Sequence, residues 1–167
     1  LSNENLGVTG KFNLNFTGDN IDNFLGTITG SNIEFVLDTI SLYLKGLSVI
    51  SDIEDGKKLL SLESDEFSGE VEGDFSLREL PAAFTLFLNK YYPSYVAPPR
   101  QDPGKEVFTF SIRTRYIDDL TKIIDPRISG LSNSTIKGRI NLPKNELELD
   151  ADIPYFAYNN IQFNYTQ

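Results

Sequence analysis

The sequence contains neither cysteine nor histidine, and these two absences remove much of the chemistry available to a small domain. Without cysteine the chain forms no disulfide and offers no thiolate ligand to a metal ion. Without histidine it has no imidazole acid–base pair, no histidine-based catalytic triad and no histidine-ligated zinc site. Tryptophan and methionine are absent as well. Carboxylates are therefore the main candidates for any chemistry.

Long hydrophobic runs are also missing. No stretch approaches the roughly 18 apolar residues that define a candidate membrane-spanning helix. With 167 residues, 40% of them hydrophobic, the chain is long enough for one domain with a real core. It opens with Leu1-Ser2-Asn3-Glu4-Asn5 rather than with methionine and a basic segment, so we expect a fragment of a longer protein whose signal or anchor lies elsewhere.

Basic residues are few relative to acidic ones. The chain has 24 acidic and 15 basic residues, which gives a net charge of −9. Nucleic-acid binding needs a concentrated basic patch, and docking on an anionic membrane surface needs basic clusters. We therefore expect no nucleic-acid partner and no electrostatic attachment to a membrane, and the simplest role of the acidity is solubility.

The dominant positive feature is an alternation of apolar and polar residues along most of the chain. A period of two places the apolar side chains of a strand on one face and the polar ones on the other. The carboxylates follow the polar half of this alternation. The clearest apolar sets are Phe12, Leu14 and Phe16; Ile33, Phe35 and Leu37; Ile40, Leu42 and Leu44; Phe108, Phe110 and Ile112; and Leu147, Leu149, Ala151 and Ile153.

Residues 7–77 are predicted to form a first β unit. The Asp55-Gly56 pair is the strongest hairpin signal, because it supplies the two residues of positive φ that a type I′ turn requires. A run containing Phe67, Val71, Phe75 and Leu77 ends the unit. The other predicted strands are Val8–Thr17, Gly26–Gly30, Ile33–Asp38, Thr39–Leu44, Leu47–Ile53 and Lys58–Ser64.

Residues 78–105 are predicted to form a helix followed by a proline-rich loop. Leu80, Phe84, Phe87, Leu88 and Tyr91 recur at helical spacing, which predicts a helix over 80–92 with Pro81 in its first turn. Pro93 ends this helix, and the prolines and glycine of 93–105 prevent regular structure.

Residues 106–167 are predicted to form a second β unit. A short helix is expected at Asp118–Ile124, and strands are expected at Glu106–Tyr116, Thr135–Leu142, Glu146–Ile153 and Ile161–Thr166. The whole of 1–167 is then a single mostly-β domain or a fragment of a longer chain. The predicted fold class is mainly β, with antiparallel strands and two short helices, and a β-sandwich is one arrangement that would bury the apolar faces.

The acidic clusters do not indicate an active site. Paired carboxylates serve glycoside hydrolysis in many enzymes, but here they lie on the polar phase of the strands, which is typical of a solvated face. Asp52, Glu54 and Asp55 match no calcium-loop pattern. We therefore expect no catalytic residue, no metal site and no cofactor. The densest cluster is Glu63, Asp65, Glu66, Glu70, Glu72 and Asp74.

An aromatic segment closes the predicted helix. Tyr91, Tyr92 and Tyr95 are candidate partner-binding residues, because exposed aromatic side chains before an extended loop could form a platform for glycan or protein. The alternative is that these side chains pack the end of the helix against the sheet.

The order of elements and motifs resembles a middle segment of a TamB-type protein of the AsmA-like superfamily, in the form found in Bacteroidetes. The resemblance covers nearly the whole chain and is carried by degenerate β-repeat patterns. The motifs are Ser68–Leu77 (SGEVEGDFSL), Tyr92–Tyr95 (YPSY), Phe108–Ile112 (FTFSI), Ser134–Gly138 (STIKG) and Ile153–Ile161 (IPYFAYNNI).

The resemblance implies a location and a function. Proteins of this family are anchored in the inner membrane, extend through the periplasm, and curl their sheets into a taco-like groove with an apolar inside. They are associated with outer-membrane biogenesis and with phospholipid movement, so phospholipid or the outer-membrane assembly machinery is the implied partner. The chain would shield lipid acyl chains, or nascent outer-membrane strands, along this groove.

Apolar residues of the alternating strands are the candidates for lining such a groove. Their alternative role is the core of a closed β-sandwich, which would serve as an envelope or surface module that binds glycan or protein through its aromatic loop. The oligomeric state is left open. The candidate groove residues are Phe12, Leu14, Phe16, Leu42, Leu44, Leu60, Leu62, Phe108, Phe110 and Ile112.

Overall fold

A computed structural model describes residues 6–37, 40–91, 94, 97–99, 104–124, 127–159 and 161–164. The elements in chain order are β1 (Leu6–Thr17), β2 (Leu25–Leu37), β3 (Ile40–Glu54), β4 (Lys57–Ser64), β5 (Phe67–Asp74), α1 (Leu80–Tyr91), β6 (Val107–Thr114), α2 (Asp118–Ile124), β7 (Ile128–Gly130), β8 (Thr135–Asn141), β9 (Glu146–Asp152), β10 (Tyr155–Tyr158) and β11 (Ile161–Asn164).

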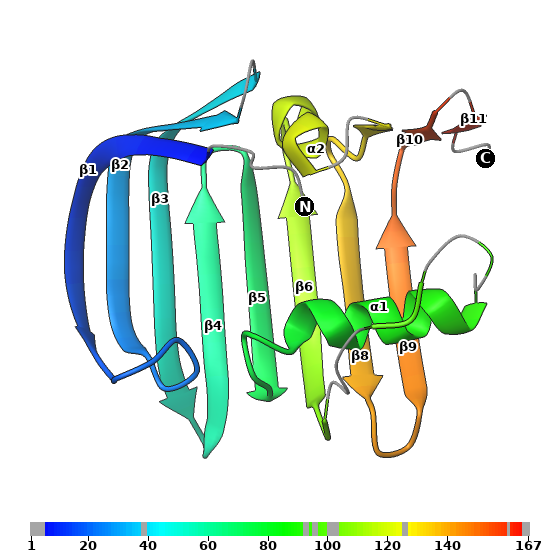
Figure 1. Ribbon diagram of the computed structural model, residues 1–167, viewed down its shortest axis with the longest axis horizontal. Coiled ribbons are helices and arrows are strands. Elements are labelled where there is room, and N and C mark those ends of the chain that lie inside the picture. The colour runs from blue at the N-terminus through cyan, green and yellow to red at the C-terminus, as the bar shows by residue number, and fades with distance from the viewer. Residues whose placement is uncertain are drawn as a thin grey trace.

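Most of these strands form one open antiparallel sheet. Its eight strands lie in the order β1-β2-β3-β4-β5-β6-β8-β9, so strands from both predicted β units share it (Figure 1). A small sheet of three strands, in the order β11-β10-β7, lies beside one end. The predicted fold class, mainly β with a curled antiparallel sheet and two short helices, is confirmed, and the main sheet is open rather than closed into a sandwich.

Two pairs of predicted strands turn out to be single long strands. Segments 26–30 and 33–38 belong to β2, and segments 39–44 and 47–53 belong to β3; residues 38 and 39 lie outside the described part. The sequence pattern suggested four strands because the positions of the apolar residues shift by one within each long strand, which interrupts the alternation. In β2 it shifts between Gly30 and Ile33, and in β3 between Leu44 and Leu47.

A β-bulge explains this phase shift. Thr9 pairs with Glu34 and Lys11 pairs with Ser31, so Gly10 of β1 lies opposite two residues of β2. One of these, Asn32, has a φ of 51°, in the left-handed region that asparagine tolerates better than most residues. The bulge reverses the alternation once, and the apolar side chains on both sides of it therefore lie on the same face of the sheet.

Other boundaries also differ from the predicted ones. β5 ends at Asp74, so Phe75 and Leu77 lie outside the strand, and β7 and β10 were not predicted. Both missed strands are short, with three and four residues, and they lack a run of alternation. The Asp55-Gly56 turn is confirmed by φ values of 49° and 78°.

The main sheet has one apolar and one polar face. Across the first four strands, Leu14 pairs with Ile28, Ile28 with Val49 and Val49 with Leu62, so these side chains share what we call the inner face. Their sequence neighbours point to the outer face. There the charges of β8 and β9 are complementary, with Lys137 opposite Asp150 and Arg139 opposite Glu148.

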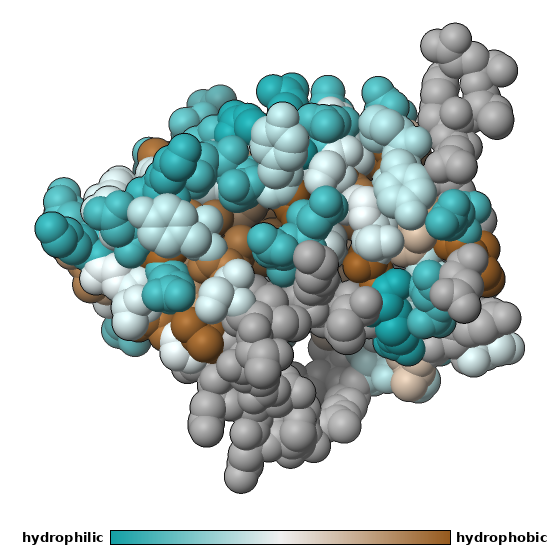
Figure 2. Space-filling view, turned by 90° about the horizontal axis from the view of Figure 1, so that it is seen from above, coloured by the Kyte–Doolittle hydropathy of each residue, from teal (hydrophilic) through white to brown (hydrophobic). Residues whose placement is uncertain are grey.

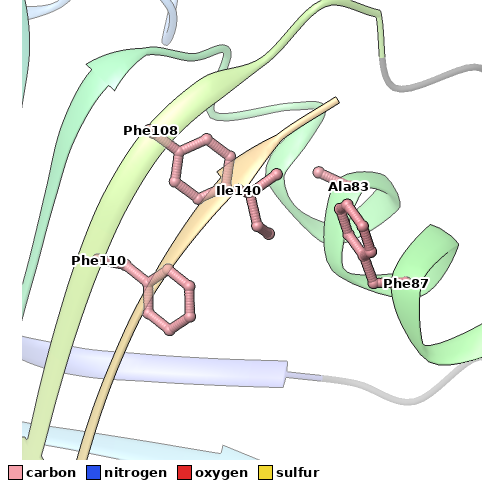
Figure 3. Packing of buried hydrophobic residues seen from close by; sticks show 5 residues of the cluster. All are labelled: Ala83, Phe87, Phe108, Phe110 and Ile140. Atoms are coloured by element: carbon pink, nitrogen blue, oxygen red, sulfur yellow. The ribbon is translucent and has the colours of Figure 1, made fainter. Parts of the chain in front are cut away.

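Helix α1 covers the inner face of β6 and β8. Phe108 and Phe110 of β6 and Ile140 of β8 point to the side where Ala83 and Phe87 of α1 lie (Figure 3). The exposed fractions of these five residues are between 0% and 6%. This buried cluster is the larger hydrophobic core of the chain.

A second core lies where the sheet curls. Ile33, Leu42 and Leu44 are buried there, and Leu120 of α2 packs against them. Figure 1 shows the first half of β1 bending across the front of the neighbouring strands, on the same side as α1. The bend follows the bulge, so a local change in backbone direction gives the sheet its curvature.

Phe108→Ala is expected to lower the free energy of unfolding by about 3–5 kcal/mol, because it removes a ring from a buried cluster. Phe12→Ala, on the uncovered part of the same face, is expected to cost about 1 kcal/mol or less. Urea denaturation of the two variants measures both values. Equal losses would show that the two rings are buried to a similar extent in solution.

Candidate apolar binding groove

The predicted groove residues all lie on the inner face, but they divide into two groups. Phe12, Leu14, Phe16 and Ile112 are exposed, and Leu62 is half-buried. The remaining ones are buried in the sheet or under the helices: Leu42, Leu44, Leu60, Phe108 and Phe110. The latter group serves mainly as core, so the open groove is confined to part of the face.

The uncovered region follows β1 and the strands next to it. Phe12, Leu14 and Phe16 expose 48%, 59% and 47% of their surface, which is unusual for three large apolar side chains in a row on one strand. Seen from above, brown hydrophobic surface shows in the middle of the molecule, behind a border of mostly teal and white residues on one side (Figure 2).

A pocket of about 490 Å³ deepens this apolar surface at one end. Of its lining residues, Phe16, Leu60 and Leu62 were predicted from the alternation. Ile21 and Phe24 were missed because they lie in a connecting segment, where no periodicity marks them. Leu77 was assigned to the run that ends the first β unit and not to the groove. The complete lining is Phe16, Gly18, Asp19, Asn20, Ile21, Phe24, Ile28, Val49, Leu60, Leu62 and Leu77.

The loop over 18–24 forms one wall of this pocket. Asn23 organises it, because its side-chain oxygen accepts hydrogen bonds from the backbone N–H groups of Asp19 and Asn20, each at 3.0 Å. Phe24 packs edge-to-face on Phe16, with ring centroids 5.1 Å apart. The loop therefore presents apolar side chains to the inner face while its polar groups satisfy one another.

Asp22 fastens the same loop to two other parts of the chain. Lys58 of β4 donates a hydrogen bond from Nζ to the Asp22 carbonyl oxygen at 2.6 Å. The Ser76 hydroxyl donates to the Asp22 carboxylate at 3.0 Å, and the Arg78 Nε lies 3.5 Å from it. These contacts hold the pocket wall against β4 and against the segment that leads into α1.

Glu106 lies buried beside this anchor. Its carboxylate accepts a hydrogen bond from the Ser76 backbone N–H at 2.8 Å. Burial, together with the neighbouring carboxyl of Glu79, raises the pKa of Glu106 to about 7. Burial also lowers the pKa of Lys58, against the opposing attraction of Asp22 and Glu106. This group of charges supports the loop and does not face the apolar pocket.

The raised pKa of Glu106 makes stability depend on pH. The folded chain binds this proton more tightly than the unfolded chain, so the contribution of Glu106 to stability is complete below its ordinary pKa of 4.5 and is lost as pH rises through about 7. Relative to Glu106→Gln, the unmodified chain should lose about 2–3 kcal/mol over this range. Urea unfolding at both ends of the range measures the difference. If the free energies of unfolding of the two proteins changed with pH in parallel, the raised pKa of Glu106 would be contradicted.

Ser51 is a buried polar residue on the inner face, between Gly26 of β2 and Leu60 of β4. Its side chain is 2% exposed, and its hydroxyl has no hydrogen-bond partner within the described part of the chain. An unsatisfied buried hydroxyl destabilises a fold.

Ser51→Ala is therefore expected to raise the free energy of unfolding by about 1 kcal/mol. Chemical denaturation measures the change. A loss of stability of similar size would mean that the hydroxyl is hydrogen-bonded in solution.

The predicted aromatic site lies outside what the structure describes. Tyr92 and Tyr95 lie outside the described residues, and the side chain of Tyr91, the last residue of α1, is likewise not described. In the described ranges, no group of three acidic residues is placed to hold a metal ion. Within the acidic cluster, Glu72 pairs with Lys57 at 3.1 Å and Glu63 pairs with Arg115 at 3.2 Å, both on the surface.

Comparisons with protein-family models, with curated proteins and with solved structures find no match for this chain. Neither helix of the described ranges has the length and apolar character required to cross a bilayer. The function is therefore argued from the geometry of the inner face.

Proposed function

We propose that this chain is a non-enzymatic segment of a TamB-like envelope protein, and that its inner face shields the acyl chains of phospholipid from water. The observation that carries the proposal is the part of the apolar inner face of β1 to β4 that the helices leave uncovered, which deepens into the 490 Å³ pocket. The resemblance of the sequence motifs to the TamB-type family supports the same assignment and, with it, a periplasmic location.

The size and chemistry of the pocket suit a hydrocarbon chain. Its volume falls within the range of about 300–1,000 Å³ that is usual for small-molecule sites. Burial of one methylene group contributes about 0.8 kcal/mol, so about ten methylenes would contribute about 8 kcal/mol before the cost of association is subtracted. This gain is of the same order as the cost of association, about 4–15 kcal/mol, so apolar contact would hold an acyl chain weakly and reversibly.

Acyl chains fit this pocket better than nascent outer-membrane strands do. The pocket lies on the face of the sheet, where only side chains are offered, whereas an added strand needs the backbone groups of a sheet edge. Asp19 and Asn20 contribute polar groups to the pocket lining, and these could remain in contact with water or a lipid headgroup while the chain lies on Ile28, Val49 and Leu62.

Two adjacent residues of β3 test the proposal, because they lie on opposite faces. Val49 lines the pocket, and Ile50 is 44% exposed on the outer face. Val49→Asn is expected to weaken binding of a phospholipid with a pyrene-labelled acyl chain about tenfold, since a polar amide replaces an apolar contact. Ile50→Asn, the matched control, should bind as the unmodified chain does. Fluorescence titration of delipidated protein measures both affinities.

Native mass spectrometry of the purified chain gives an independent result. Co-purified phospholipid is expected on the unmodified protein and on the Ile50→Asn variant, and less on Val49→Asn. Absence of bound lipid together with no binding of the labelled lipid would refute the proposal. Equal loss of binding in both variants, with folding intact by circular dichroism, would place the lipid elsewhere than the inner face.

A further inference from the structure

Strand β1 is an edge of the main sheet, and its segment after the bulge has little of the usual edge protection. It is the outermost strand of the main sheet and pairs with β2 alone among the described elements, so its other side presents backbone N–H and C=O groups without strand partners. The strand has 12 residues, contains no proline, and has Lys11 as its one charged residue. Natural proteins usually guard such edges with charges, prolines or short strands.

The opposite edge of the same sheet is protected. Glu146, Glu148, Asp150 and Asp152 lie along β9, each opposite a residue of β8 on the outer face. Pairing β9 with a copy of itself would bring these carboxylates close together across the new interface. The two edges therefore differ in charge, and only β1 is compatible with its own copy.

We propose that β1 pairs antiparallel with β1 of a second copy of this chain. The paired segment is Lys11–Thr17, which follows the bulge, and the two-fold axis passes beside Leu14. In this register Leu14 lies opposite Leu14 of the second copy, and Phe12 lies opposite its Phe16. Lys11 lies opposite Thr17, so no like charges face each other.

The register also keeps the two apolar faces together. Phe12, Leu14 and Phe16 occupy the inner face at every second position, and an antiparallel pairing about Leu14 places the same residues of both copies on one side. Each cross-strand apolar pair contributes about 0.2–1 kcal/mol, in addition to the hydrogen bonds of the new ladder. Such an interface is small, and a dissociation constant in the micromolar range is expected.

The test uses charges on the outer face, where they do not disturb the apolar side chains. Asn13 lies opposite Asn15 of the second copy, and both side chains are exposed. The double variant N13K/N15K brings like charges together and should raise the dissociation constant at least about tenfold at low salt. T27K/T29K adds the same charge on β2, which is paired on both sides, and serves as the matched control.

Sedimentation velocity of delipidated protein, from about 5 to about 500 µM, measures the effect. The unmodified chain and the control are expected to approach twice the monomer mass with rising concentration, and N13E/N15K should dimerise more tightly because opposite charges then face each other. A monomer at every concentration would overturn the proposal, as would equal weakening by N13K/N15K and by the control. The result does not depend on lipid binding, so either proposal can fail without the other.

Discussion

The whole structure depends on one constraint, which is that an open sheet with one apolar face must keep that face away from water. The period-two alternation places most large apolar side chains on the inner face, and the two short helices of the described ranges cover part of it. Helix α1 covers β6 and β8, and α2 packs against the curled part of the sheet. The rest of the inner face, on the first strands, stays exposed. Both functional proposals start from this surplus of exposed apolar surface.

The bulge at Gly10 determines where that surplus lies. If the alternation continued without interruption, Ile33 and Leu44 would face away from Ile28 and Val49, and both faces of the sheet would be partly apolar. One inserted residue corrects the phase and bends the strand at the same point. A side chain at Gly30 would displace a neighbour at the bend, because its β-carbon would lie 2.6 Å from Cδ1 at the end of the Ile33 side chain.

The elements with strong periodicity were predictable from the sequence, and those with interrupted periodicity were not. The helices at 80–91 and 118–124, the Asp55-Gly56 turn and strands β4, β6 and β8 follow directly from local patterns. The continuity of β2 and β3 was hidden by the phase shift. The pocket wall formed by Ile21 and Phe24 was not predictable, because tertiary contacts of Asp22 with Lys58 and Ser76, rather than a local pattern, hold this loop in place.

The contacts of Asp22 have a mechanical consequence for the sheet. They connect the turn after β1 to β4 and to the segment after β5, and so reach across the inner face between strands that are not neighbours. A sheet of this length could otherwise flatten by small changes in twist between each pair of strands. The Asp22 contacts oppose such flattening, because they join the loop over 18–24 to β4 and to the segment after β5.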